Sequence, residues 1–266
     1  MLNKDKILKY LPLALPVSVE VLDTAVSTNT MLKQLAREGA PEGTVLLARQ
    51  QTGGRGRLGR NFLSERDKGL YMSLLLRPEL PAERLMGLTG LAAVASATAC
   101  EEACTAPVGI KWVNDLILRG KKLGGILTEL CLSPEGIAYG AVIGIGINLL
   151  YTKEAFAAAG LDGIATSFLA EGLQEDENAL AARLIAQYLS VGRSLKAGSV
   201  QDYLAQYRRR CITLQQPVRV LYPEGAVSAL ALDIDDNFGL VVKSEEGKIS
   251  TVSAGEVSVR GYYGYV

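Results

Sequence analysis

The 266-residue sequence contains no histidine. This absence excludes Ser-His-Asp and Cys-His catalysis, and it leaves zinc or haem sites without their commonest ligand. Any chemistry must therefore rest on lysine, arginine, aspartate and uncharged polar groups, and we assign no residue as a metal ligand.

Cysteines and long apolar segments are also scarce. The four cysteines show neither a C-x-x-C pair nor the spacing of a disulfide-rich secreted domain, so we expect reduced thiols. The apolar stretch 11–19 is interrupted by Pro12 and Pro16, unlike the core of a signal peptide. The next apolar stretch, 85–100, falls short of the roughly 20 residues that a membrane-spanning helix needs. We therefore expect a cytoplasmic protein that does not associate with membranes.

The chain has no excess of either charge, because 28 lysines and arginines balance 28 aspartates and glutamates. No general positive field would hold it on nucleic acid or on an anionic membrane. Hydrophobic residues make up 48% of the sequence, which is enough for the core of one large domain or of a large and a small domain. Any positive patch must be local.

Hydrophobic patterning predicts an α+β fold. Successive hairpins between 109 and 149 favour a mixed or antiparallel sheet flanked by helices over β-α-β crossovers. Beyond 213, short apolar runs separated by turn residues predict a small β-barrel. We therefore expect a large domain at 1–212 and a small domain at 213–266. The predicted strands are 17–22, 43–49, 70–76, 109–113, 115–118, 122–132, 137–149, 218–220, 229–234, 240–242, 249–252 and 257–259, and the predicted helices are 28–38, 81–103, 177–195 and 200–210.

The most informative segment places three arginines among four glycines at 53–60, directly after a predicted strand. Glycines let backbone N–H groups converge, and guanidinium groups supply planar donor forks that fit carboxylate and phosphate oxygens. The G-x-G-x-x-G spacing does not predict a dinucleotide site, because such a site needs a helix that begins within the motif, and here the strand 70–76 follows. We expect this glycine-arginine loop to bind an anion; the alternatives are a mobile connection and an RNA contact.

Four other segments carry polar or cationic side chains close to glycines or strand ends. They are the polar run 27–30, the strand end 110–115 with the chain's only tryptophan, the lysine-glycine strand start 121–127 and the glycine-interrupted strand 144–149. Each has a structural alternative: a helix cap, a core tryptophan beside a turn, a hairpin with solvated lysines and a bulged strand. In the functional interpretation, Lys111 binds a phosphate and Asp115 an amine or a metal ion.

Taken in order, these segments resemble the biotin protein ligases. The motifs that carry the resemblance are Ser27-Thr28-Asn29, Gln51-Thr52-Gly53-Gly54-Arg55-Gly56-Arg57, Lys111-Trp112-Val113-Asn114-Asp115, Lys122-Leu123-Gly124-Gly125-Ile126-Leu127 and Gly144-Ile145-Gly146-Ile147-Asn148. The C-terminal strands, which end at 253–260, resemble that family's SH3-like barrel. The resemblance implies a catalytic domain at 1–212 that makes biotinoyl-AMP from biotin and ATP with Mg²⁺. It then acylates one lysine of a biotin carboxyl carrier domain.

The resemblance also assigns roles to individual residues. Biotin would contact Ser27, Thr28, Asn29, Gln51, Gly54, Arg55, Gly56, Arg57, Lys122, Gly124 and Gly125. ATP would contact Arg57, Arg60, Lys111, Trp112, Asn114 and Asn148. Catalysis would rest on Lys122, Arg57, Lys111 and Asp115, the last of which would orient the acceptor lysine. These types suit the reaction, because a carboxylate that attacks an α-phosphorus brings two anions together and needs clustered cations.

Two departures from the family pattern bear on the prediction. Val113 stands where many relatives have proline, which leaves the functional side chains in place. Only about twenty residues precede the catalytic domain, too few for a winged helix-turn-helix, so we expect no specific DNA binding. Strands that pair across a two-fold axis would give a homodimer. The alternative functions are a lipoate-protein ligase of the related fold and a non-enzymatic module that senses biotin or contacts RNA.

Overall fold

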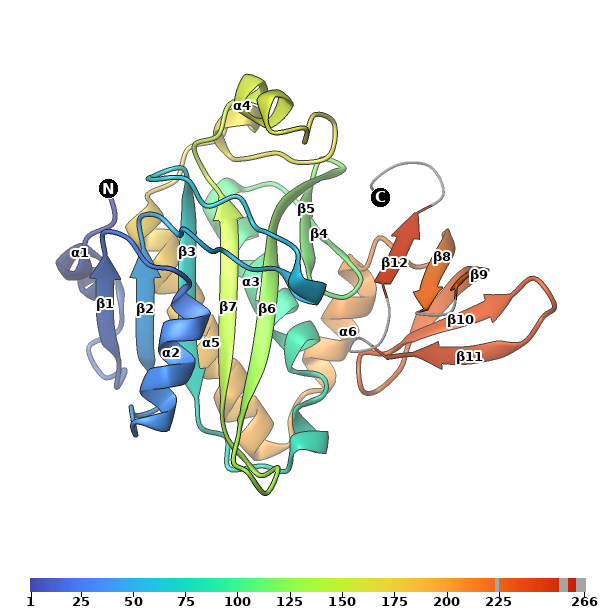
Figure 1. Cartoon of the computed structure of the whole chain (residues 1–266), viewed down its shortest axis with the longest axis horizontal. Coiled ribbons are helices and arrows are strands. Elements are labelled where there is room, and N and C mark those ends of the chain that lie inside the picture. The colour runs from blue at the N-terminus through green and yellow to red at the C-terminus, as the bar shows by residue number, and fades with distance from the viewer. Residues whose placement is uncertain (223–224, 254–257, 262–266) are drawn as a thin grey trace.

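The computed structural model of this protein describes residues 1–222, 225–253 and 258–261. Its strands form two sheets (Figure 1). The large sheet contains β1 (Ser18–Leu22), β2 (Thr44–Ala48), β3 (Gly69–Leu76), β4 (Val108–Lys111), β5 (Asp115–Leu118), β6 (Lys121–Leu132) and β7 (Ala138–Asn148). The small sheet contains β8 (Pro217–Tyr222), β9 (Gly225–Ile234), β10 (Leu240–Ser244), β11 (Ile249–Val252) and β12 (Ser258–Gly261).

The large sheet is mixed, as the predicted hairpins indicated. Its strand order is β1-β2-β3-β7-β6-β5-β4, with β1 and β2 parallel and the other described pairs antiparallel. The small sheet is antiparallel, in the order β11-β10-β9-β8-β12. Within the described residues no pairing closes β11 onto β12, so the expected SH3-like element is an open sheet there. Positions 254–257, where the predicted strand 257–259 begins, lie outside the described residues.

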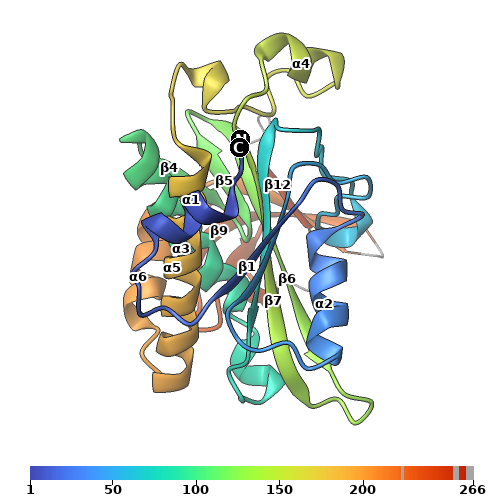
Figure 2. The same ribbon diagram turned by 90° about the vertical axis from the view of Figure 1, so that its left-hand side faces the viewer.

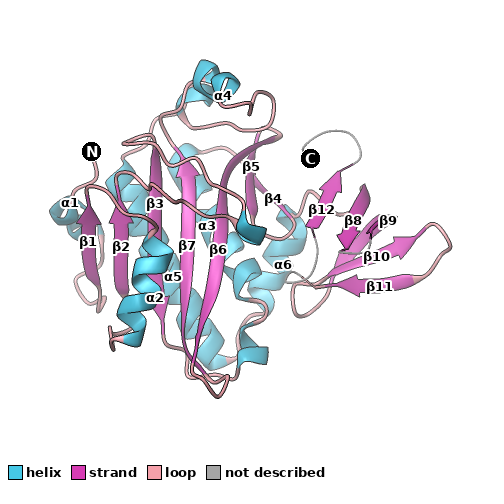
Figure 3. Ribbon diagram, in the orientation of Figure 1, coloured by secondary structure: helices cyan, strands magenta, loops and turns pink. Residues whose placement is uncertain are grey.

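Helices cover both faces of the large sheet (Figure 2). On one face lies α2 (Thr28–Arg37), and on the other lie α1 (Lys4–Tyr10), α3 (Leu88–Cys104), α5 (Glu177–Ala197) and α6 (Gln201–Arg210). The short helix α4 (Lys153–Ala158) lies beyond one end of the strands, and three 3₁₀ turns are η1 (Arg57–Gly59), η2 (Ala82–Leu85) and η3 (Leu169–Glu171) (Figure 3). No helix in the described ranges is both long enough and apolar enough to cross a bilayer.

The main core lies between the sheet and the helices α3 and α5. Almost every residue from 90 to 100 in α3 is buried, as expected for a helix that is apolar on all sides. On the opposite face, a smaller cluster joins Leu32 and Ala36 of α2 to the sheet residues Leu46 and Val142. Beside α2, the glycine-arginine loop crosses in front of β7 and β6 (Figure 1). On this face the sheet is covered only by α2 and the glycine-arginine loop among the described residues, which leaves room for a site.

The structure interrupts one predicted helix and contains an N-terminal helix that the sequence pattern did not predict. The helix predicted at 81–103 is interrupted, because residues 82–85 form η2 and α3 begins only at Leu88. Gly87 and Gly90 have a packing reason, since an added side chain at either position would meet the Phe238 ring. The N-terminal helix α1 was not predicted, because seven residues are too few for a clear helical period, although the Asn3 side chain caps it.

Candidate functional site

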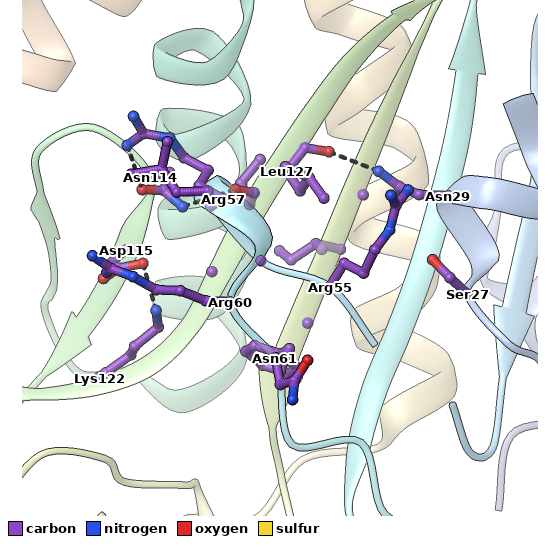
Figure 4. A pocket seen from close by; sticks show the side chains of 18 of the residues that line it. Ser27, Asn29, Arg55, Arg57, Arg60, Asn61, Asn114, Asp115, Lys122 and Leu127 are labelled. Atoms are coloured by element: carbon purple, nitrogen blue, oxygen red, sulfur yellow. Dashed lines mark hydrogen bonds and ion pairs between the residues drawn. The ribbon is translucent and has the colours of Figure 1, made fainter. Parts of the chain in front are cut away.

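A cavity of about 640 Å³ opens between the N-terminal end of α2, the glycine-arginine loop and the strands β6 and β7 (Figure 4). It brings together residues from all five sequence motifs. The residues that line it are Ser27, Thr28, Asn29, Gln51, Arg55, Gly56, Arg57, Leu58, Arg60, Asn61, Phe62, Met72, Lys111, Trp112, Asn114, Asp115, Lys122, Gly125, Ile126, Leu127, Gly144, Ile145, Gly146 and Ile164.

Three residues assigned to ligands from the sequence are not among those that line this cavity, and their assignment stays a prediction. Each of them has contacts within the protein. Asn148 is buried, and its side-chain amide donates to the Thr166 carbonyl oxygen over 3.0 Å. An added side chain at Gly124 would overlap the Gly146 carbonyl oxygen, so Gly124 allows β6 and β7 to pack closely. Gly54 likewise lies against the backbone and side chain of the returning loop, at Phe62 and Ser64.

One end of the cavity carries a network of uncharged polar groups at the start of α2. Ser27 caps this helix, its side chain accepting from the Thr30 amide. The side-chain oxygen of Gln51 accepts from both the amide and the hydroxyl of Thr28, over 2.9 and 3.2 Å. The buried Ser73 hydroxyl lies 2.7 Å from the Thr28 hydroxyl. The helix-cap interpretation of this segment is therefore correct, and the same residues also face the cavity.

Asn29 occupies a space that a glycine provides. Its amide nitrogen donates to the Leu127 carbonyl oxygen over 3.1 Å, and its side-chain oxygen lies 2.6 Å from the Ser73 hydroxyl (Figure 4). An added side chain at Gly144 would overlap Asn29 directly. A bulge does not explain Gly144, because the register of β7 with β3 and β6 runs without a shift through this position.

The other end of the cavity carries the cations. Lys122 donates to the Asp115 carboxylate over 2.7 Å, and Arg57 donates to the Asn114 side-chain oxygen over 3.3 Å (Figure 4). Lys111 lies opposite Asp115 across the hairpin of β4 and β5 and is only 9% exposed. Burial lowers the pKa of the Arg57 guanidinium, and nearby Arg60 adds to this, while Asp115 opposes it. Cations held close together in this way favour a ligand that brings negative charge.

The turn between β4 and β5 places this cationic end against the small sheet. Trp112 is buried, its ring nitrogen donates to the Phe238 carbonyl oxygen over 2.9 Å, and its amide donates to the Thr213 hydroxyl over 3.0 Å. The hydroxyl of Tyr207 donates to the Val113 carbonyl oxygen over 3.1 Å. The core-tryptophan interpretation therefore holds, although one side of Trp112 also lines the cavity.

Sequence patterns missed the apolar part of the lining. Phe62, Met72 and Ile164, which lie outside the five motifs, come from a loop, from β3 and from the segment after α4. The one sequence signal for any of them was Gly146, since an added side chain there would overlap the Phe62 ring. The cavity thus combines an uncharged polar end, an apolar lining and a cationic end. It can hold a molecule with a neutral hydrogen-bonding head, an aliphatic part and an anionic group.

Comparisons with known proteins agree with this chemistry. Residues 21–148 match the biotin/lipoate A/B protein ligase family, and residues 213–260 match the biotin protein ligase C-terminal domain. The biotin–[acetyl-CoA-carboxylase] ligase of Mycobacterium tuberculosis is 34% identical over 252 residues, which cover 90% of this chain and 88% of that relative. This chain belongs to the biotin protein ligase family.

Two further relatives extend the similarity. The bifunctional ligase/repressor BirA of Bacillus subtilis is 34% identical over 226 residues, covering 85% of this chain and 69% of BirA. The solved biotin protein ligase of Aquifex aeolicus in complex with biotin and ATP has a TM-score of 0.76 and 29% identity, covering 92% of this chain and 99% of that one. The resemblance and the fold class inferred from the sequence motifs are confirmed, whereas the domain boundary at 212 stays a prediction.

Proposed function

We propose that this protein is an ATP-dependent ligase that converts biotin to biotinoyl-5′-AMP and transfers the biotinoyl group to a lysine of a biotin carboxyl carrier domain. The observation that carries the proposal is that Arg57, Lys111 and Lys122 line the same cavity as Ser27, Thr28 and Gln51. One cavity thus offers cations for an acid and a nucleotide beside neutral polar groups for a ring. The relatives from Mycobacterium tuberculosis and Aquifex aeolicus are biotin ligases by name, which favours biotin over lipoate.

The uncharged end suits the ring system of biotin. A ureido group presents both N–H donors and a carbonyl acceptor, which need both kinds of partner when they leave water. Thr28, Gln51 and the neighbouring Ser27 supply them, and their mutual hydrogen bonds fix their directions before a ligand arrives. The apolar residues Met72 and Ile145 would then cover the aliphatic chain, and the carboxylate would extend toward Lys122 and Arg57.

The first step joins two anions. A carboxylate oxygen of biotin attacks the α-phosphorus of ATP, a new O–P bond forms, and pyrophosphate leaves. Lys122 and Arg57 would stabilise the charge that develops between carboxylate and phosphate, and Lys111 and Arg60 would hold the phosphates. Because Lys122 already sits within 2.7 Å of Asp115, its ammonium group is held at the cavity before ligands bind.

The second step needs a neutral lysine on the acceptor, whose ammonium has an ordinary pKa of about 10.4. Asp115 would accept a hydrogen bond from this amine once Lys122 has turned to the adenylate phosphate, and so orient its lone pair toward the acyl carbon. Attack forms the amide bond, AMP leaves with the electron pair of the broken C–O bond, and the proton lost by the amine nitrogen passes to solvent.

Mg²⁺ would enter with the triphosphate of ATP. Within the described ranges, no three carboxylate or cysteine side chains gather as a metal site. A cytoplasmic location, a homodimer, the carrier domain as partner and the absence of specific DNA binding all stay predictions from the sequence.

Mass spectrometry of the purified protein with biotin, Mg-ATP and a carrier domain tests the proposal. We expect the carrier to gain the mass of one biotinoyl group on one lysine, and a carrier with that lysine changed to arginine to gain nothing. Lipoate in place of biotin serves as the matched control for the related ligase activity. An unmodified carrier under these conditions, or faster modification by lipoate, would contradict the proposed function.

A further inference from the structure

Glu129 of β6 is an anion that no sequence motif singled out. Its carboxylate accepts from the Lys33 ammonium over 2.8 Å and from the Asn29 amide over 3.0 Å. It also lies 3.5 Å from the guanidinium of Arg55, whose other hydrogen bond goes to the Thr30 hydroxyl over 3.0 Å. One carboxylate therefore joins three parts of the protein: β6, the first turns of α2 and the glycine-arginine loop.

This carboxylate stands just outside the cavity. Along β6, side chains alternate between the two faces, so Glu129 projects on the same side as Leu127, one pleat further from the cavity. Leu127, Asn29 and Arg55 all line the cavity, whereas Glu129 does not. Its contact with a ligand would therefore be indirect, through Asn29 and Arg55.

Two cations, Lys33 and Arg55, lie close to the Glu129 carboxylate. Its side chain is 19% exposed, and Lys33 alone supplies a short ion pair. Burial by itself would raise the pKa of Glu129, but hydrogen bonds from Lys33 and Asn29 and the nearby Arg55 charge lower it below the ordinary value. The carboxylate is therefore ionised at neutral pH. Arg55 is its second cation and comes from the glycine-arginine loop, most of which is partly or fully exposed.

We propose that Glu129 is a positioning residue that anchors the glycine-arginine loop over the cavity through Arg55. These contacts hold the loop against β6 and α2, so they favour the arrangement in which Arg57 faces the cavity. The role in retaining an adenylate rests on the proposed function, whereas the loop anchor does not. A loop closed in this way would exclude water from the reactive anhydride.

Limited proteolysis tests the anchor without any ligand. Trypsin cuts after arginine, and cleavage after Arg57 or Arg60 reports the population of the opened loop. We expect Glu129→Gln to be cut about threefold to fivefold faster than the parent, the effect typical of losing one exposed ion pair. Glutamine keeps an acceptor for the Asn29 amide, so the change removes chiefly the charge.

Two other variants separate the anchor from general weakening. Lys33→Met removes the shorter ion pair of Glu129 but leaves Arg55 in place, so its loop should be cut at the parental rate. Arg55→Met should open the loop at least as much as Glu129→Gln, because it also removes the hydrogen bond to the Thr30 hydroxyl. The double variant should open the loop no more than Arg55→Met alone, because the contact between Arg55 and Glu129 can be lost only once. Parental cleavage of Glu129→Gln, multiplying effects in the double variant, or equal acceleration by Lys33→Met would overturn the proposal.

Release of biotinoyl-AMP from the purified complex provides the second measurement. Glu129→Gln should release it about threefold to fivefold faster than the parent. Should the parent form no adenylate, the proposed function fails and the cleavage rates still decide the anchor. If adenylate forms and leaves both proteins equally fast, the anchor plays no part in retention.

Discussion

At the scale of single residues, we expect Lys122 to contribute little to stability and much to catalysis. It is partly exposed and pairs with Asp115, and this ion pair contributes only about 0–1 kcal/mol to the free energy of unfolding. Its ammonium nevertheless faces the position where a carboxylate and a phosphate would meet. We predict that Lys122→Met slows adenylate formation about 100-fold or more, as loss of a charge-stabilising donor does.

The rate of pyrophosphate release measures this effect, and urea unfolding measures stability in parallel. Lys121→Met is the matched control, because Lys121 is the adjacent lysine on the same strand and does not line the cavity. We expect near-parental pyrophosphate release from that control. A Lys122→Met protein that releases pyrophosphate at the parental rate would remove Lys122 from the proposed mechanism.

At the scale of elements, β7 shapes the cavity because its glycines carry no side chains and so leave room for neighbouring residues. Because Gly144 makes room for the Asn29 side chain, Gly144→Ala must displace that side chain from the Leu127 carbonyl oxygen and from Glu129. We predict a loss of about 1–3 kcal/mol in the free energy of unfolding, as for other overpacked sites. Biotin affinity, measured by calorimetry, should fall at least about tenfold, since a difference of 1.4 kcal/mol is tenfold in binding.

Gly140→Ala separates packing from binding. Gly140 lies on the same strand, and an added side chain there would meet Leu75 and Leu76 at 3.2 and 3.3 Å, but it does not line the cavity. This variant should therefore lose stability while keeping its biotin affinity. Equal losses of affinity in the two variants would mean that Gly144 acts only through the strength of the sheet.

The sequence predicts elements and motifs better than it predicts the complete lining. Ser27 to Asn29, the glycine-arginine loop and Lys122 lie in contiguous runs whose composition indicates their chemistry, and the structure gathers these runs. Phe62 and Ile164 could not be predicted, because their place in the cavity depends on how separate segments fold back onto the sheet. Asn148 stays a predicted nucleotide contact, and the hydrogen bond from its amide to the Thr166 carbonyl oxygen is a role that the composition of its motif does not indicate.

At the scale of the whole molecule, the two sheets join at Phe238. This buried residue lies in the turn after β9, in a left-handed conformation with φ of 62°. Its ring packs on Gly87, just before α3, and on Gly90 of α3. It also lies edge-on to the Tyr207 ring, with the two centroids 5.3 Å apart. Its carbonyl oxygen accepts from Trp112, which lines the cavity. The turn after β9 of the small sheet thus packs against Trp112 at the cationic end of the cavity.

We predict that Phe238→Ala lowers the free energy of unfolding by about 3–5 kcal/mol, the usual cost of replacing a buried phenylalanine by alanine. Trp112 is the chain's only tryptophan, so its fluorescence reports this junction directly during urea unfolding. Far-ultraviolet circular dichroism reports the remaining helices and strands. If the junction makes the two sheets unfold together, both signals change in one transition in the parent, and in the variant the fluorescence changes first.

Phe238→Leu provides the control, because leucine keeps much of the apolar volume and leaves the backbone carbonyl available to Trp112. It should lose less stability than Phe238→Ala and keep coincident transitions. The alanine variant should also form adenylate more slowly, since Trp112 and the adjacent Lys111 lose their support from the small sheet. Unchanged unfolding midpoints and rates in Phe238→Ala would show that the small sheet is only attached to the catalytic part and contributes nothing to the geometry of its cationic end.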